Sequence, residues 1–418
     1  MLLNAIWVGF FLIGFLVAFF KMLQGDLGIF TRLMSGLFDA AKTGFDISLG
    51  LVGVMSLWLG IMRIGEKAGL IEQFAKLLAP LFHRIFPEVP KGHPASGSIV
   101  MNMSANMLGL DNAATPLGLK AMKELQLLNP KPDQASDAMI MFLVLNTAGI
   151  TLIPTSVIAI RQTMAIEQGL KGFNGADIFL PALIGTFVSF SAGLIAVAWV
   201  QRIRLTSPPV LSFFAAFGGL IGLLYLSLQG LESHQLNQRI GLIGSVVILS
   251  VISLFMLAAV IRQVNVYESF VDGAKEGFSV AVQIIPYLVA MLVAISVFRN
   301  SGCMDYIVHG IGSIVRELGW DDRFVAALPV GLMKVLSGSG ARGLMVDVMK
   351  TYGVDSFEGQ LAAIIQGSTE TTFYVLAVYF GSVNILKTRH ALACALWADL
   401  IGLIAAILIA YAFFGHSL

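Results

Sequence analysis

Residues 96–110 read Ser-Gly-Ser-Ile-Val-Met-Asn-Met-Ser-Ala-Asn-Met-Leu-Gly-Leu, and the polar run Asp111-Asn112-Ala-Ala-Thr115-Pro116 follows directly. This mostly apolar stretch is too short to cross a membrane comfortably, because a spanning helix needs about 20 apolar residues. Pro116 is expected at the first position of a second helix that runs to about Leu128. The sequence therefore predicts a re-entrant hairpin with its tip inside the membrane.

The composition is that of a membrane protein. Apolar residues make up 57% of the 418 residues, charged residues make up 12%, and the mean hydropathy is +0.85. Soluble globular proteins are about 25% charged, so this composition excludes a soluble enzyme and a secreted disulfide scaffold. The net charge of +1 provides no basic surface for nucleic acid. Cys303 and Cys394 are interpreted as small buried apolar residues.

Long apolar runs mark nine candidate membrane spans. They lie near residues 3–20, 45–62, 137–160, 177–200, 210–228, 239–261, 278–298, 359–380 and 390–414. The first run has no Lys or Arg before Lys21, and no small-residue cleavage site follows it. We therefore expect a retained helix there and not a signal peptide.

A second hairpin of the same plan is expected later in the chain. The short apolar piece Phe324–Leu336 is followed by a turn that begins Ser337-Gly-Ser339-Gly. An amphipathic stretch precedes each hairpin, near Arg63–Arg84 and near Tyr306–Leu318. Charged residues that interrupt an apolar run in this way are typical of a helix lying in the membrane interface.

Matching motifs predict an internal duplication. Lys42-Thr-Gly44-Phe45 resembles Lys275-Glu-Gly277-Phe278, and Gly69 and Gly302 are separated by the same number of residues. We expect an all-α polytopic membrane protein with two homologous repeats, each with four spanning helices, an interfacial helix and a re-entrant hairpin. The expected units are residues 1–205 with a core at about 42–161, a linking span at 206–235, and residues 236–418 with a core at about 272–382.

The relative orientation of the repeats depends on the hairpins. If each hairpin enters and leaves on one side, the linking span adds an odd crossing and the second repeat is inverted relative to the first. Inverted repeats with broken helices that meet near the membrane midplane are typical of secondary transporters. If the hairpin regions cross the membrane fully, the repeats are parallel.

Polar residues at the first hairpin are candidates for binding a solute. Amide side chains both donate and accept hydrogen bonds, and a helix start inside the membrane offers free backbone N–H groups. The alternative is that these side chains only cap and staple a broken helix. The candidates for substrate binding are Asn102, Ser104, Asn106, Asn112 and Thr115, and Asp111 is a candidate for the coupling ion or proton.

The second repeat supplies matching candidates. Ser337 and Ser339 lie in a glycine-rich turn, which allows close approach of the backbone. Lys334 and Arg342 flank this turn, and they either bind an anionic group or face water. Glu370 is the strongest candidate for binding the substrate and for binding the coupling ion or proton. A carboxylate within an apolar run of spanning length is energetically costly and commonly functional. Its alternative role is a structural hydrogen bond to a neighbouring helix.

Broken helices are expected to add further candidates. Pro154 interrupts the run at 137–160 and frees carbonyl groups there. Asp399, in the last run, either pairs internally or joins a proton path. The remaining candidates for substrate binding are Asn146, Thr147, Ser368 and Thr369.

Several kinds of chemistry are not expected from this sequence. The six His residues have no metal-ligand spacing, and the chain has neither a phosphate-binding loop nor a nucleophile-elbow motif. We therefore expect no metal site, no cofactor and no enzymatic activity.

Long motifs in the chain resemble known families. Residues 106–122, which read Asn-Met-Leu-Gly-Leu-Asp-Asn-Ala-Ala-Thr-Pro-Leu-Gly-Leu-Lys-Ala-Met, resemble the signature of the spore maturation protein A family. Residues 273–291, 337–342 and 367–374 resemble the spore maturation protein B family, so the chain is similar to a fusion of the two over nearly its whole length. Asp111 departs from the pattern, because glycine is expected there in many relatives. Both families resemble the nucleoside-recognition, or Gate, family.

This resemblance implies hairpins and broken helices around a central polar site. In the concentrative nucleoside transporters, which the Gate resemblance includes, hairpin amides and a glutamate on a broken helix hold the nucleoside. The positions here that fit such roles are Asn102, Asn106, Asn112, Ser337, Ser339 and Glu370.

We therefore predict a secondary transporter of a small polar solute, such as a nucleoside, a nucleobase or an amino-acid-like molecule, coupled to H⁺ or Na⁺. Its expected location is the bacterial inner (plasma) membrane, as a multi-pass protein. Its expected partners are the solute, the coupling cation and the lipid bilayer, with no nucleic acid, and a homo-oligomer is compatible with the sequence. The alternatives are a non-transporting membrane factor in spore maturation or envelope assembly, and an ion channel lined by Asn and Ser.

Overall fold

The computed structural model describes residues 2–90, 92–109, 111–228 and 233–415, with the side chains of all of these but residues 2–3, 111–113, 233–234 and 236–237. Within these ranges the chain forms helices and loops, with no strand, as predicted for an all-α protein. The first half contains α1 (Leu2–Leu23), α2 (Ile29–Lys67), α3 (Leu70–Ile85), α4 (Pro94–Met107), α5 (Asp111–Leu127), α6 (Asp137–Thr147), α7 (Thr155–Glu167), the short 3-10 helix η1 (Gly175–Ile178) and α8 (Phe179–Gln201).

The second half contains a similar series of α-helices after a linking helix, with its 3-10 helix before the hairpin and not after the broken helix. The linking helix is α9 (Pro208–Leu226). It is followed by α10 (Ser233–Ile261), α11 (Val266–Asn300), α12 (Cys303–Glu317), the 3-10 helix η2 (Arg323–Ala327), α13 (Leu328–Leu336), α14 (Gly338–Tyr352), α15 (Phe357–Ser368), α16 (Thr372–Gly381) and α17 (Ala391–Phe414). In each half a long helix, an amphipathic helix, a helical hairpin, a broken helix and a spanning helix follow one another.

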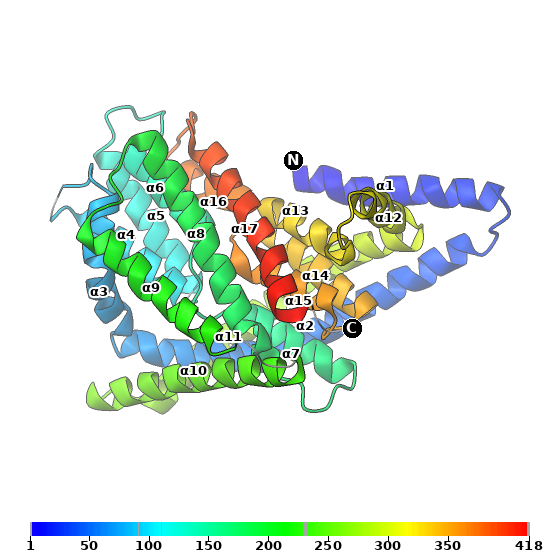
Figure 1. The fold of residues 1–418 in the computed structure, drawn as a ribbon, viewed down its shortest axis with the longest axis horizontal. Coiled ribbons are helices and arrows are strands. Elements are labelled where there is room, and N and C mark those ends of the chain that lie inside the picture. Colours follow the sequence, from blue (N-terminus) through cyan, green and yellow to red (C-terminus); the bar gives the residue numbers. More distant parts are fainter. Residues whose placement is uncertain (1, 91, 110, 229–232, 416–418) are drawn as a thin grey trace.

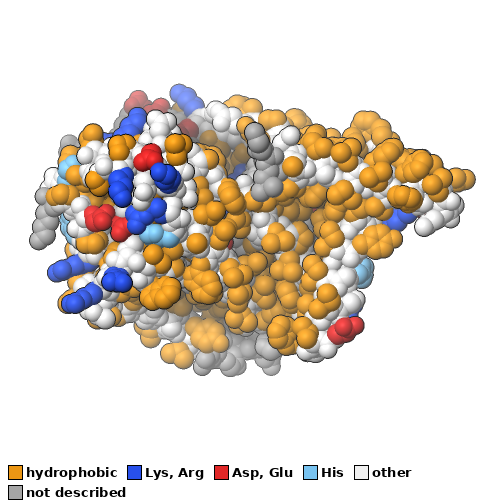
Figure 2. All heavy atoms as spheres, turned by 90° about the horizontal axis from the view of Figure 1, so that it is seen from above, with side chains coloured by type: hydrophobic (Ala, Val, Ile, Leu, Met, Phe, Trp, Pro, Cys, Tyr) orange, Lys and Arg blue, Asp and Glu red, His pale blue; other side chains and the backbone are white. Residues whose placement is uncertain are grey.

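Eight helical segments among the described residues are long and apolar enough to cross a membrane, so the chain is a multi-pass membrane protein. The predicted span at 137–160 is not one of them, because its helix stops at Thr147 and resumes at Thr155. Hydrophobic side chains cover a broad area of the surface, while charged side chains gather at one end (Figure 2). Such a surface suits contact with lipid on the face that this view shows.

One predicted helix start is wrong. The second helix of the first hairpin begins at Asp111, so Pro116 lies inside α5 and not at its first position. Proline lacks the backbone N–H and removes one donor from the ladder. Pro116 lies within the second turn of α5, close to the first backbone N–H groups, which have no partner inside the helix in any case.

Matching helices of the two halves pack antiparallel. In α2 and α11, Gly44 lies against Val289 and Gly277 lies against Met55, so the start of each helix faces the end of the other. Glycine allows this close approach, because a Cβ on Gly277 would lie only 2.5 Å from the carbonyl oxygen of Met55. The inverted relation of the repeats remains a prediction, which this packing supports.

The second matching pair, α8 and α17, packs in the same antiparallel way. Gln201, at the end of α8, lies 3.2 Å from His390, just before α17. Ser189, in the middle of α8, donates to the carbonyl of Ala398, farther along α17. Figure 1 shows these two helices in the main body of the molecule, from which α1 and the first part of α2 project together.

A buried arginine also joins the halves. Arg161 on α7 is fully buried, and it donates to both carboxylate oxygens of Asp177, at 2.9 and 3.0 Å. The same guanidinium donates to the carbonyl of Val354, in the second half, at 3.0 Å. A buried charge is tolerated when it is paired and hydrogen-bonded in this way, so the pair fixes α7 against the loop before α15.

Candidate functional site

The two broken helices meet at their interruptions. The first is the pair α6 and α7, which is interrupted from Ala148 to Pro154, and the second is the pair α15 and α16, interrupted from Thr369 to Thr371. The backbone N–H of Glu370 donates to the carbonyl of Thr147 at 2.8 Å. Each interruption leaves backbone N–H and C=O groups without helical partners. This hydrogen bond pairs one such group from each break across the two halves.

Each hairpin tip lies against the break of its own half. The carbonyl of Met107 accepts from the backbone N–H of Leu152 at 2.8 Å. Gly109 has a φ of +74°, and a Cβ added to it would lie 3.2 Å from the carbonyl oxygen of Ile153. In the second half, a Cβ on Gly338 would lie 2.8 Å from the hydroxyl of Thr371. Both tips therefore depend on glycine for close contact with a broken helix.

A cavity of about 760 Å³ lies beside the second hairpin tip. The Glu370 side chain is exposed in it, and among the residues that the structure describes its carboxylate has no hydrogen bond or ion pair. Arg342 supplies a cation to the same cavity. The other residues that line it are Tyr287, Leu336, Ser337, Gly338, Ser339, Thr371, Phe373 and Tyr374.

A smaller adjoining cavity of about 60 Å³ connects this region to the first hairpin. Glu370 and Arg342 line it too, together with Lys334 from the second hairpin and Gly109 from the first. Glu370 is therefore the residue at which the breaks and both hairpins converge. A carboxylate can accept from a hydroxyl or an amine, and a guanidinium can donate to a carbonyl or a phosphate.

Asn102, Asn106 and Asn146 do not line this cavity, and they form a separate network. The Asn146 side chain accepts from Asn106 at 2.8 Å and donates to the carbonyl of Phe142 at 2.8 Å. The Tyr379 hydroxyl on α16 lies 3.4 Å from Asn146 and 3.5 Å from Asn102. Asn102 also donates to the carbonyl of Ala114 at 2.7 Å, which joins the two helices of the hairpin.

Tyr379 is absent from the predicted residues, although it is the hub that joins the network to the second half. The signal was a single tyrosine hydroxyl in the otherwise apolar stretch Val375–Phe380. A buried tyrosine hydroxyl normally finds a partner, so this position could have been included.

Three predicted hydroxyls bond within their own helices. Ser104 donates to the carbonyl of Val100 at 2.7 Å, and Thr147 and Ser368 make the same kind of bond to the preceding turn. Ser337 caps α14, because its hydroxyl accepts from the backbone N–H of Gly340 at 3.1 Å. These contacts favour the structural interpretation of the hydroxyls.

The remaining predicted residues lie elsewhere. Thr369 lines a small internal cavity that includes Asp399. Thr115 is half-buried on α5 and does not line the main cavity. The side chains of Asp111 and Asn112 lie outside the described residues. No group of three or more His, Cys, Asp or Glu side chains is placed to hold a metal ion in the part of the chain that the structure describes.

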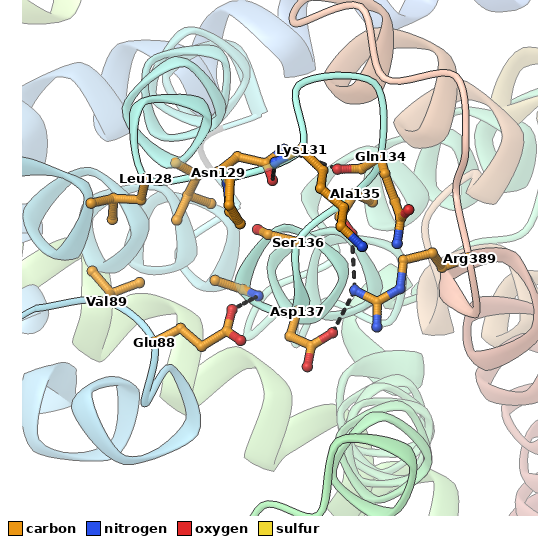
Figure 3. Close-up of a pocket in the computed structure, with 13 residues that line it drawn as sticks. Glu88, Val89, Leu128, Asn129, Lys131, Gln134, Ala135, Ser136, Asp137 and Arg389 are labelled. Atoms are coloured by element: carbon orange, nitrogen blue, oxygen red, sulfur yellow. Dashed lines mark hydrogen bonds and ion pairs between the residues drawn. The ribbon is translucent and has the colours of Figure 1, made fainter.

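A cavity of about 430 Å³ lies outside the membrane-crossing segments, between the loops before α6 and α17 (Figure 3). Arg389 pairs with Asp137 at 2.7 Å and donates to the carbonyl of Ala135 at 3.0 Å. Glu88 accepts from the backbone N–H of Ala138 at 3.3 Å. The predicted site residues do not line this cavity, and its charged groups instead connect a loop of the first half to a loop of the second.

Comparisons with known proteins match the two halves of the chain separately. A family model described as "Gate: nucleoside recognition" matches residues 48–164 and 281–386, and each range contains one hairpin and one broken helix. Spore maturation protein B of Bacillus subtilis (strain 168) is 47% identical over 167 residues, which cover 40% of this chain and 92% of that protein. Spore maturation protein A of the same organism is 40% identical over 188 residues, which cover 45% of this chain and 90% of that protein. The chain belongs to the nucleoside-recognition, or Gate, family.

Proposed function

We propose that this protein is a secondary transporter of a small polar solute, coupled to H⁺ or Na⁺, in the bacterial inner (plasma) membrane. The observation that carries the proposal is the position of Glu370, at the meeting point of two broken helices and two hairpins, with its carboxylate in a cavity. Broken helices that face one another from two repeats are the usual setting of a transported solute. A carboxylate without an internal pair among the described residues is available at such a place to a solute or a cation.

A nucleoside is the first solute to test. A cavity of about 760 Å³ is in the range that holds a small organic ligand. Tyr287, Phe373 and Tyr374 offer aromatic rings for a base, and Glu370 can accept from ribose hydroxyls. The family description names nucleoside recognition, which supports the same choice. Nucleobases and amino-acid-like solutes belong in the same screen.

The proposed partners follow from this function. They are the solute, a coupling cation and the surrounding lipid bilayer, and a homo-oligomer is compatible with the projecting apolar surface of α1 and α2. The protein is proposed to carry out no catalysis, since its role is to bind and release the solute unchanged.

A thermal-stability screen of the detergent-purified protein tests the proposal. A solute present at a hundred times its dissociation constant stabilises the protein by about 2.7 kcal/mol. We expect a nucleoside to raise the melting temperature of the wild type and of Glu317→Gln, an exposed glutamate on α12 that does not line the cavity. Glu370→Gln is expected to melt cooperatively without any response to the nucleoside.

Two results would contradict the proposal. A cooperative wild-type melt with no response to any solute in the screen would favour a non-transporting assembly factor. An equal response in wild type and Glu370→Gln would place the binding site elsewhere. Uptake into proteoliposomes under an imposed H⁺ or Na⁺ gradient then separates transport from binding alone and identifies the coupling cation.

A further inference from the structure

Asp399 is a buried acid outside the set of residues assigned to solute binding, and its small cavity shares Lys334 with the cavity of about 60 Å³ that Glu370 lines. It lies on α17 with 7% of its surface exposed. One carboxylate oxygen, Oδ2, accepts from the Thr372 hydroxyl at 2.6 Å. The other, Oδ1, has no hydrogen-bond partner among the described residues. A buried polar atom without a partner is costly, so Oδ1 is where a proton or a solvent molecule would be stabilised.

Lys334 is the charged group that faces this acid. It is 5% exposed, and it lines the same small cavity as Asp399, with room for about one water molecule. The other elements packed against this part of α17 are uncharged here: α15 contributes Ser368, the break after it contributes Thr369, and α16 contributes Thr372. α8 contains no charged residue, and Asp137, the one acid of α6, lies at the far end of that helix and pairs with Arg389.

Asp399 therefore has a stabilising partner in either protonation state. The charged carboxylate is attracted by the ammonium group of Lys334. The neutral acid keeps its hydrogen bond from Thr372, and its burial costs less because it carries no charge. We infer that Asp399 is a proton-binding residue whose charge holds the second hairpin in place through Lys334. The proton binds at Oδ1, and it is released to water through the cavities.

Lys334 connects Asp399 to the second hairpin and to the cavity that Glu370 lines. It belongs to α13, the first helix of the second hairpin, and it also lines the cavity that holds Glu370 and Arg342. When Asp399 is protonated, its attraction for Lys334 is lost and the contact of the hairpin with α17 is weakened. When Asp399 is charged, the hairpin is drawn back. The last step, from hairpin movement to solute transport, rests on the proposed transport function.

Infrared difference spectroscopy of the purified full-length protein tests proton binding directly. The wild type is expected to lose the C=O stretching band of a protonated carboxylic acid between acidic and alkaline buffer. One component of this band is expected to be missing from Asp399→Asn, which keeps an oxygen for Thr372, and to remain in Glu370→Gln, while the contributions of the other Asp and Glu side chains are common to the compared proteins. A pH-dependent band in Asp399→Asn that is identical to that of the wild type would overturn the inference.

A second variant keeps the test decisive if Asp399→Asn fails to fold. Lys334→Met removes the positive charge that favours the carboxylate, so the band is expected to persist to more alkaline pH than in the wild type. An unchanged titration would remove Lys334 from the mechanism and overturn the inference. Because none of these measurements uses a solute, they remain informative even if the proposed transport function is wrong.

Thiol labelling of an introduced cysteine tests the movement of the second hairpin. Leu332 is exposed on α13, so Leu332→Cys reports the position of the hairpin, while Cys303 and Cys394 are buried. The rate at which a thiol reagent labels this cysteine rises with pH in any background, because the thiolate is the reactive form. With Asp399 present, the rate is expected to show an additional pH dependence, which is lost with Asp399→Asn. A pH dependence that is equal in both would separate the acid from the hairpin and contradict the inference.

Discussion

The backbone N–H of Glu370 donates to the carbonyl of Thr147 at 2.8 Å, and this bond joins the ends of two interrupted helices from different halves of the molecule. The bond involves only backbone atoms, so the Glu370 carboxylate stays available to the cavity. Because this hydrogen bond joins the two breaks, neither break can move relative to the other without breaking it. The candidate site is thus a place where both halves are in contact.

The left-handed turn at Gly109 is expected to be required for solute binding. Gly109 and Gly172 have nearly equal positive φ angles, +74° and +75°, but only a Cβ at Gly109 would meet a neighbour, the carbonyl oxygen of Ile153. Each Gly→Ala change is expected to cost about 1–2 kcal/mol of folding stability, because a Cβ disfavours this backbone conformation. Only Gly109→Ala is expected also to weaken the thermal response to a bound nucleoside.

Gly172→Ala is the matched control, because it carries the same backbone strain in open space. The melting temperatures of both variants, with and without nucleoside, decide the point. A full nucleoside response in Gly109→Ala would show that the contact of this tip with the broken helix does not shape the site.

Asn146 is expected to be a structural centre of the buried amide network. Asn146→Leu leaves Asn106 without its acceptor, and a buried group left unpaired costs about 1–3 kcal/mol. Tyr379→Phe is expected to cost less, under about 1 kcal/mol, because the distances from its hydroxyl to Asn146 and Asn102 are long, 3.4 and 3.5 Å.

Ser104→Ala serves as the comparison, since its hydroxyl bonds only to its own helix at Val100. We expect a change within about 0.5 kcal/mol there. Thermal unfolding of the three variants in detergent ranks them. A cost for Tyr379→Phe equal to that of Asn146→Leu would mean that the hydroxyl, and not the amide, holds the network together.

Local signals predicted the hairpins and breaks, whereas long-range pairings stayed hidden. Pro154 and the Ser337-Gly turn interrupt apolar runs in a way that any single segment reveals, because a missing N–H or a missing Cβ acts locally. The start of α5 at Asp111 was mispredicted, because Pro116 is a local start signal that the surrounding helix overrides. The Tyr379–Asn146 contact joins residues from different halves, and no periodicity within either half encodes it.

The inverted arrangement of the repeats predicts opposite membrane sides for two matching loops. Lys131 lies in the loop before α6, and Asp355 lies in the corresponding loop before α15; both are exposed. A membrane-impermeant maleimide applied to one face of sealed vesicles is expected to label only one of Lys131→Cys and Asp355→Cys. The natural Cys303 and Cys394 are buried, which keeps the background low. Labelling of both from the same face would establish parallel repeats.

The ion pair between Asp133 and Lys387 links a loop of each half outside the membrane, and its contribution to folding stability is expected to be lost in acid. The two side chains lie 2.9 Å apart, and the hydrogen bond and charge of Lys387 hold the pKa of the Asp133 carboxyl below its usual range. A group whose pKa is lower in the folded state contributes stability above its unfolded pKa, which is about 3.9 for Asp. That contribution is lost as the pH falls through the folded pKa.

Lys387→Met is therefore expected to lower the melting temperature slightly at neutral pH and to lose this effect in strongly acidic buffer. The effect is small and weakens in high salt, because the Asp133 and Lys387 side chains are 51% and 68% exposed. Lys171→Met, at an exposed lysine with no ion pair among the described residues, is the control for the loss of a positive charge. The Asp133 carbonyl still accepts from the backbone N–H groups of residues 386 and 387 in the variant, so the loops stay together. A difference between wild type and Lys387→Met that grows on acidification would mean that the loops are held by groups other than this pair.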